Sequence, residues 1–166
     1  MGICIDEELS TRAESLIKRL RGAGLSVITA ESCTAGLLAA VLSYGTNASE
    51  CLCGGFVVYT KEQKSASLGV DAALLRERGS VNELVARHMA EGALHRSQAR
   101  MALSITGVLG PDADEDNNPP GLVYFGLARG DRPTVTLRRH FVQMHPDVVR
   151  KCTVVTALDV LNGAVE

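Results

Sequence analysis

Hydrophobic residues recur at steps of three and four positions between Asp6 and Arg21, and Gly22 and Gly24 follow directly. This spacing predicts a helix with one buried face, and the glycines predict where it ends. The residues expected on its buried face are Leu9, Ala13, Leu16, Ile17 and Leu20. A short β-branched run at 25–30 then predicts a strand, and a run of small apolar residues at 34–44 predicts a second helix.

The same order of strand and helix continues along the chain. Further strands are predicted at 54–59, 101–106, 122–128 and 134–142, and further helices at 61–68, 71–78, 82–96 and 146–161. Asn82 is placed to cap the helix that follows it. In the last helix the positions expected to face inward are Val149, Cys152, Val155 or Thr156, and residues 158–160. Helices alternating with strands and then a hairpin predict an α/β fold whose mixed sheet is covered on both faces.

Length and composition favour one globular domain over residues 1–166. Hydrophobic residues make up 46% of the chain, which excludes a disordered protein, and no run approaches the length of a membrane span. The formal charge is −2 and there is no Trp. Because neither a basic surface nor base-stacking aromatics are indicated, we expect neither nucleic acid nor a membrane as a partner.

The amino terminus lacks the cationic and apolar regions of a signal peptide, so we expect a cytoplasmic protein. Its five cysteines are then expected to be reduced thiols: Cys4, Cys33, Cys51, Cys53 and Cys152. The spacing of Cys51 and Cys53 is one residue short of a zinc pair, and no second pair follows. We therefore expect no metal site.

Ser32 lies where the first predicted strand ends and a helix begins. Ligands of open α/β sheets bind at the carboxyl ends of strands, where a helix start offers unpaired N–H groups. Ser32 is therefore a candidate nucleophile, although Ser32 or Thr34 is equally placed to cap the helix. The nucleophile-elbow pattern G-x-S-x-G is absent around Ser32.

A nucleophilic serine needs a base, and none of the four histidines occurs in a sequence pattern that would place it beside Ser32 as that base. Lys61 and Lys64 follow Tyr59 at the end of the second strand, beside the end of the first if the two strands are parallel. A desolvated lysine can be neutral near pH 7, so Ser32, Tyr59 and one lysine are expected to converge. An exposed helix start is the alternative. Spacing alone does not choose between the lysines, but Lys64, one turn further into the helix, is the better candidate for burial.

The polar loop at 107–120 begins with the glycine-containing segment Thr106–Pro111, which lets backbone amides approach a phosphate or carboxylate. Asp112, Asp114 and Asp116 imitate the start of an EF-hand, but Asn117 and Val123 occupy the positions that need Gly and Glu. A solvated acidic turn is the expectation there.

Several segments in order resemble the CinA carboxy-terminal domain family, whose stand-alone members include nicotinamide mononucleotide amidases. The matching segments are Ala30-Glu31-Ser32-Cys33-Thr34-Ala35-Gly36, Gly55-Phe56-Val57-Val58-Tyr59 with Lys64, Met89-Ala90-Glu91-Gly92-Ala93, Thr106-Gly107-Val108-Leu109-Gly110-Pro111 and Pro119-Pro120-Gly121-Leu122-Val123-Tyr124. The likeness covers nearly the whole chain. It implies a three-layer α/β/α sandwich with a mixed, mostly parallel sheet.

The resemblance also implies hydrolysis of nicotinamide mononucleotide to nicotinic acid mononucleotide and ammonia, without a metal or organic cofactor. Ser32 would be the nucleophile, Lys64 its base, and Tyr59 a neighbour that orients or relays the proton. Substrate-binding positions would be Thr34, Thr106, Gly107 and Arg150, with Arg150 meeting the phosphate. The N–H groups of Cys33 and Thr34 are the candidates for an oxyanion hole. We also expect a homo-oligomer.

Four positions depart from the pattern that the resemblance leads us to expect. Ala35 replaces a glycine, Thr60-Lys61 replaces a Ser-Asn pair, Asn82 replaces a serine, and Asn118 replaces a lysine. These changes affect the shape of the pocket and leave the expected nucleophile and base in place. A nucleotide-binding or partner-binding module without turnover is therefore the alternative function.

Overall fold

The computed structural model describes residues 5–165, and within them the chain forms a five-stranded sheet in the order β2-β1-β3-β4-β5. The strands are β1 (Val27–Glu31), β2 (Leu52–Val57), β3 (Met101–Gly107), β4 (Leu122–Arg129) and β5 (Arg132–His140). Strand β1 pairs in parallel with both β2 and β3, whereas β3 with β4 and β4 with β5 pair antiparallel. Only β4 among these strands runs against the others, so the sheet is mixed and mostly parallel, as predicted.

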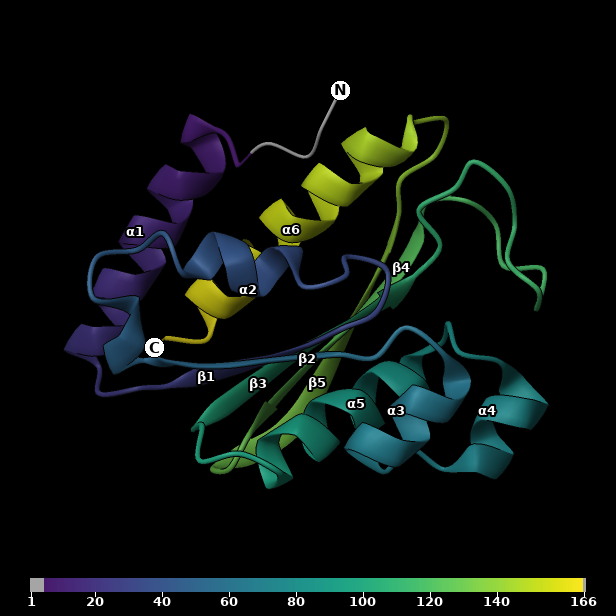
Figure 1. The fold of residues 1–166 in the computed structure, drawn as a ribbon, viewed down its shortest axis with the longest axis horizontal. Coiled ribbons are helices and arrows are strands. Elements are labelled where there is room, and N and C mark those ends of the chain that lie inside the picture. The colour runs from purple at the N-terminus through teal and green to yellow at the C-terminus, as the bar shows by residue number, and fades with distance from the viewer. Residues whose placement is uncertain (1–4, 166) are drawn as a thin grey trace.

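Helices cover both faces of the sheet (Figure 1). The helices on one face are α1 (Glu7–Gly22), α2 (Leu37–Leu42) and α6 (Pro146–Gly163). Those on the other are α3 (Lys61–Leu68), α4 (Ala72–Arg78) and α5 (Glu83–His95), and a short 3₁₀ turn, η1 (Ala48–Glu50), precedes β2. The three-layer α/β/α sandwich is therefore confirmed.

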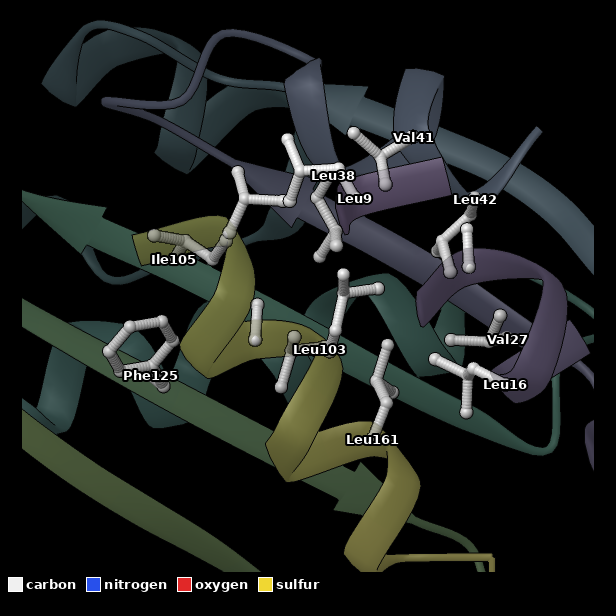
Figure 2. Packing of buried hydrophobic residues seen from close by; sticks show 14 of the residues in the cluster. Leu9, Leu16, Val27, Leu38, Val41, Leu42, Leu103, Ile105, Phe125 and Leu161 are labelled. Carbon is white, nitrogen blue, oxygen red and sulfur yellow. The ribbon is translucent and has the colours of Figure 1, made fainter. Parts of the chain in front are cut away.

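Alternation along the strands divides the core between the two faces, because successive side chains of a strand point to opposite sides. Leu103 and Ile105 of β3 join the cluster under α1, α2 and α6, where the five predicted inward residues of α1 are all buried (Figure 2). Ala102 of β3 joins the second cluster, under α3, α4 and α5. Both faces of β1 and β3 are thus closed to water, whereas Cys53, Gly55 and Val57 of the edge strand β2 are exposed.

Gly92 of α5 seats α3 against the second face. A Cβ at this position would lie 2.0 Å from the carbonyl oxygen of Leu68, the last residue of α3. Since only glycine permits so close an approach, Gly92 sets how near α3 packs to α5. Helix α3 carries Lys64, so this contact also positions the candidate base.

Two predictions about helices are wrong in detail. Helix α2 begins at Leu37 and not at Thr34, because Ala35 and Gly36 adopt left-handed backbone angles with φ of 51° and 94°. In α6, the predicted inward positions Val149 and Leu158 are buried, but Cys152, Val155, Thr156 and Val160 are only half-buried and Asp159 is exposed. The other buried positions are Thr153, Val154, Ala157 and Leu161. Apolar residues occur around most of this helix, so the hydrophobic pattern does not select its buried stripe.

The described cysteines, Cys33, Cys51, Cys53 and Cys152, are all free thiols, while Cys4 lies outside the described residues. Among residues 5–165, none of the helices combines the length and the hydropathy that crossing a bilayer requires.

Candidate active site

The loops that follow β1, β2 and β3 meet at one edge of the sheet, because these strands are parallel and in register. Glu31 at the end of β1 lies opposite Val57 of β2 on one side and Ile105 of β3 on the other. The N–H of Ser32 donates to the Ile105 carbonyl at 3.0 Å, which holds the residue after β1 against β3. Ser32 therefore lies at the carboxyl ends of the strands, where the sequence predicts it.

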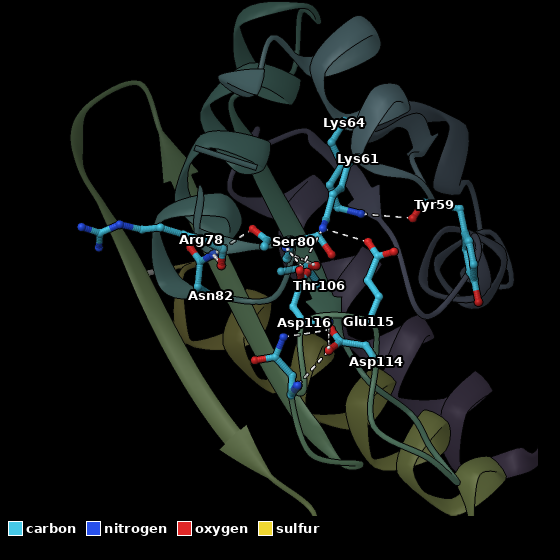
Figure 3. A network of polar contacts seen from close by, with 12 residues as sticks. Tyr59, Lys61, Lys64, Arg78, Ser80, Asn82, Thr106, Asp114, Glu115 and Asp116 are labelled. Atoms are coloured by element: carbon cyan, nitrogen blue, oxygen red, sulfur yellow. Dashed lines mark hydrogen bonds and ion pairs between the residues drawn. The ribbon is translucent and has the colours of Figure 1, made fainter. Parts of the chain in front are cut away.

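Lys64 reaches the same edge from the helix that follows β2. Thr60 caps α3, its hydroxyl accepting from the Gln63 N–H at 3.1 Å, and Lys64 lies one turn later. Its side chain is 1% exposed, and its Nζ lies 2.9 Å from Ser32 Oγ. The carbonyl oxygens of Val58 and Tyr59 lie 3.1 and 3.2 Å from the same nitrogen. Figure 3 shows the contact with Tyr59. The predicted convergence of Ser32 with a buried lysine is thus present.

Burial lowers the pKa of Lys64 from 10.5 to about 8, because the charged form loses its hydration inside the protein. The charge of Lys61 lowers this pKa further, to a smaller extent. About a tenth of Lys64 is then neutral at pH 7.

The two carbonyl groups also orient the amine. A carbonyl oxygen only accepts hydrogen bonds, so the two N–H groups of neutral Lys64 are directed to Val58 and Tyr59. The nitrogen lone pair is then left for the third neighbour, the Ser32 hydroxyl. Neutral Lys64 is therefore oriented to accept the proton of Ser32.

Lys61 differs from Lys64 in each of these respects. Its Nζ forms ion pairs with Glu115 at 2.8 Å and Asp116 at 3.0 Å. The hydrogen bonds to these carboxylates raise the pKa of Lys61. The structure thus leaves Lys64 as the lysine in contact with Ser32.

Glu31 shapes the turn that presents Ser32, and the sequence analysis did not identify this role. Its carboxylate is fully buried and accepts five hydrogen bonds at 2.7–3.1 Å. The donors are the hydroxyls of Thr29 and Thr34 and the N–H groups of Gly36, Leu38 and Ala39. The sequence did carry one signal for this role: a single Glu ends an apolar strand just before a helix.

The carboxylate of Glu31 overturns two expectations about the start of α2. The N–H groups of Leu38 and Ala39 are satisfied within the protein, so they are not open to a ligand. The capping group is Glu31 and not Ser32 or Thr34, because the Ser32 hydroxyl meets Lys64 and the Thr34 hydroxyl donates to Glu31.

A cavity of about 270 Å³ opens above Ser32. Of the predicted site residues, Ser32, Cys33, Tyr59, Gly107 and Arg150 line it. The rest of its wall comes from Ser80, Val81, Val108, Leu109, Gly110 and Asp114. Ser80 and Val81, between the predicted helices at 71–78 and 82–96, were not predicted as site residues, because the hydrophobic pattern carries no signal for a loop that folds back over a strand end.

Thr34, Thr106 and Tyr59 do not present their side chains as predicted. The Thr34 hydroxyl donates to Glu31 at 2.7 Å, and the Thr106 hydroxyl donates to the Ser80 carbonyl at 2.7 Å. Both side chains are buried and support the walls of the cavity from behind. Tyr59 is 70% exposed, and it contacts Lys64 through its main-chain carbonyl and not through its phenol.

The N–H groups of Cys33, which lines the cavity, and of Thr34, which does not, follow Ser32 in the chain. Neither donates to the backbone of another residue within the described part of the chain. Burial raises the pKa of the Cys33 thiol to about 12, so this sulfur stays protonated and is a poor nucleophile. Ser32 therefore remains the candidate nucleophile of the site.

Arg150 of α6 supplies the positive charge at the cavity wall. Its Nη1 lies 3.4 Å from Asp147 Oδ1, one turn earlier on α6. That long contact leaves most guanidinium donors available to an anionic ligand. Over residues 5–165 there is no cluster of three or more metal-ligating side chains at the cavity or elsewhere.

Comparison with known sequences identifies the domain. A family model described as the CinA C-terminal domain matches residues 9–165. A CinA-like protein of Geobacter sulfurreducens is 40% identical over 163 residues, which cover 98% of this chain and 39% of that protein. A CinA-like protein of Mycobacterium avium is 44% identical over 131 residues, covering 79% of this chain and 30% of the relative. The chain thus spans less than half the length of these relatives.

Solved structures give the same result. The competence/damage inducible protein CihA from Agrobacterium tumefaciens superposes with a TM-score of 0.91 at 33% identity, covering 99% of both chains. A competence-damaged protein (CinA) superfamily protein from Escherichia coli superposes with a TM-score of 0.87 at 31% identity, covering 97% of this chain and 99% of the other. The chain therefore belongs to the CinA C-terminal domain family.

Proposed function

We propose that this protein is an amidase that hydrolyses the carboxamide of nicotinamide mononucleotide, giving nicotinic acid mononucleotide and ammonia. The observation that carries the proposal is the contact of Lys64 Nζ with Ser32 Oγ at 2.9 Å, beside a cavity that also holds Arg150. Membership of the CinA family supports a CinA-like role. The substrate is the one that the resemblance to this family implies, and the chemistry of the site is compatible with it.

Acylation begins with neutral Lys64. Its lone pair accepts the Ser32 hydroxyl proton as Oγ attacks the carboxamide carbon. The tetrahedral intermediate collapses when Lys64 returns this proton to the leaving nitrogen, which departs as ammonia. The product of this half-reaction is an ester between Ser32 and the nicotinoyl group.

Deacylation reverses the roles. Lys64 accepts a proton from water as the water oxygen attacks the ester carbon, and then returns the proton to Ser32 Oγ. Nicotinic acid mononucleotide leaves, and both residues regain their starting forms. The N–H groups of Cys33 and Thr34 are our candidates to stabilise the oxyanion of both tetrahedral intermediates.

Two features favour a pyridine mononucleotide among amides. The cationic ring withdraws electrons from the carboxamide, and its charge beside Lys64 favours the neutral amine. Arg150 provides paired donors for a phosphate. A cavity of about 270 Å³ lies near the lower end of the range for small-molecule sites, which favours a mononucleotide over a dinucleotide.

The test is ammonia release by the purified protein from nicotinamide mononucleotide, nicotinamide riboside and free nicotinamide. We expect the mononucleotide to be the best substrate by kcat/KM, since only it offers both the activated amide and the phosphate. Equal or faster turnover of free nicotinamide would contradict the role of Arg150. Binding of the mononucleotide without ammonia release would support the alternative, a nucleotide-binding module without turnover.

A further inference from the structure

The loop at 107–120 forms one wall of the cavity through Val108, Leu109, Gly110 and Asp114. The sequence predicts a solvated acidic turn here, and residues 111–113 and 115–117 are indeed exposed, but the Asp116 side chain itself is only 27% exposed. Asp116 therefore has contacts that a solvated turn does not need.

Asp116 connects the loop to two other segments (Figure 3). Its Oδ1 accepts from Lys61 Nζ at 3.0 Å, and its Oδ2 accepts from the Ser80 N–H at 3.4 Å. Gly79 makes room for this carboxylate, since a Cβ there would lie 2.4 Å from Asp116 Oδ2. We call Asp116, Lys61 and Ser80 the Asp116 network.

The segment around Ser80 is itself held firmly. The Thr106 hydroxyl donates to the Ser80 carbonyl at 2.7 Å, and Asn82 Nδ2 donates to the carbonyls of Arg78 and Gly79, both at 3.1 Å. The Asn82 side-chain oxygen caps α5 by accepting from the Val85 N–H at 3.0 Å. Asp116 thus attaches the loop to a segment that a strand and a helix both fix.

The other end of the network leads to the candidate base. Lys61 occupies the first turn of α3, one turn before Lys64. Its second partner, Glu115, pairs with it at 2.8 Å but is 74% exposed and makes no recorded contact with Ser80 among the described residues. Glu115 is therefore a matched control for Asp116, because it is the adjacent residue and its carboxylate pairs with the same lysine but does not bind Ser80.

We propose that Asp116 is a positioning residue that holds the 107–120 loop as a wall of the cavity, through Lys61 and Ser80, and thereby sets the affinity for substrate. It does not reach the reacting atoms. The substrate part of this inference rests on the proposed amidase function, whereas the attachment of the loop does not.

The first test is amide hydrogen–deuterium exchange, which needs no substrate. We expect exchange within 107–120 to rise about tenfold in Asp116→Ala and less in Lys61→Ala, with α1 unchanged and with Glu115→Gln like the parent. Equal exchange in the parent and Asp116→Ala would overturn the proposal. If Asp116→Ala does not fold, Lys61→Ala carries the same comparison.

The second test separates binding from chemistry, with nicotinamide mononucleotide as the probe. We expect Asp116→Ala to raise KM at least fivefold and to leave kcat within twofold, and Lys61→Arg to keep a KM closer to the parent's than Lys61→Ala does. A lower kcat at unchanged KM, or no change in either, would overturn the positioning role. A parent without turnover would instead refute the proposed function, and the exchange measurement would still decide whether Asp116 attaches the loop.

Discussion

Lys64 Nζ lies 2.9 Å from Ser32 Oγ, although Ser32 belongs to the loop after β1 and Lys64 to helix α3, which follows the loop after β2. The parallel pairing of β1 with β2 brings these loops together, and α3 then directs Lys64 inward. The fold thus buries a lysine whose three hydrogen-bond partners within the described residues are one hydroxyl and two carbonyl oxygens, with no carboxylate among them. Burial of this amine, which removes the hydration of its charged form, lowers its pKa to about 8.

This depressed pKa predicts a pH-dependent difference in stability between the parent and Lys64→Met, which keeps the side-chain volume. Between pH 8 and 10.5 the folded parent binds fewer protons at Lys64 than the unfolded chain does, so its stability rises with pH in that window. Below pH 8 the cost of burying the charge is present in full. We expect the free energy of unfolding of the parent, relative to Lys64→Met, to rise by about 3 kcal/mol across the window, measured by urea denaturation. A constant difference would mean that Lys64 is not desolvated.

The same titration predicts the pH profile of activity. Because the base must be neutral, kcat/KM is expected to rise with pH through an apparent pKa of about 8. Lys64→Ala should remove activity, whereas Lys61→Ala should keep most of the parent's kcat, since Lys61 pairs with carboxylates away from Ser32. Steady-state kinetics of both variants from pH 6 to pH 10 test this. An inactive Lys61→Ala variant would show that Lys64 had been wrongly assigned as the base.

Glu31 is expected to be essential for the turn that carries Ser32. In Glu31→Gln the amide NH₂ replaces one acceptor oxygen and faces backbone N–H groups that are already donors. We expect a loss of about 2 kcal/mol in the free energy of unfolding, because buried donors are left unsatisfied. Glu14→Gln is the control: Glu14 also accepts a backbone N–H, that of Thr46, but at the surface, so this change should leave the free energy of unfolding close to the parent's. Equal effects of the two changes would refute the capping role of Glu31.

Arg150 is expected to recognise the phosphate. Its removal in Arg150→Ala should lower kcat/KM for nicotinamide mononucleotide by about 10- to 100-fold, the loss of one charge-assisted contact. Turnover of nicotinamide riboside, which has no phosphate, should change little. Parallel assays of the two substrates decide the point, and equal losses on both would make Arg150 a structural residue.

The order of helices and strands was predictable from the sequence, because each element carries its own hydrophobic period and glycine or polar boundaries. The five buried positions of α1 are an example. The buried stripe of α6 could not be predicted, because a helix that is apolar on most sides has no distinct polar face. The start of α2 also depended on positive φ angles at Ala35 and Gly36, which alanine rarely adopts.

In the site, Ser32 and Lys64 were predictable because they lie near the carboxyl ends of neighbouring parallel strands, and the strand topology alone brings the segments that follow those ends together. The roles of Ser80 and Asp116 were not, since each depends on contacts between segments far apart in the chain. The partners of Glu31 lie at most eight positions away, but its role depends on the left-handed turn at Ala35 and Gly36, which the hydrophobic pattern does not show. The Thr34 and Thr106 hydroxyls were assigned to substrate because residue type and position do not reveal that a buried carboxylate and a carbonyl already use them.

The central claim is that Ser32 is the nucleophile, and Ser32→Ala tests it most directly. The variant loses only the hydroxyl that meets Lys64, so its free energy of unfolding should stay within about 1 kcal/mol of the parent's. We expect the purified variant to bind nicotinamide mononucleotide as the parent does while its rate of ammonia release falls by at least about 10³-fold. Ammonia release at a rate close to the parent's, from a folded Ser32→Ala protein, would contradict the account.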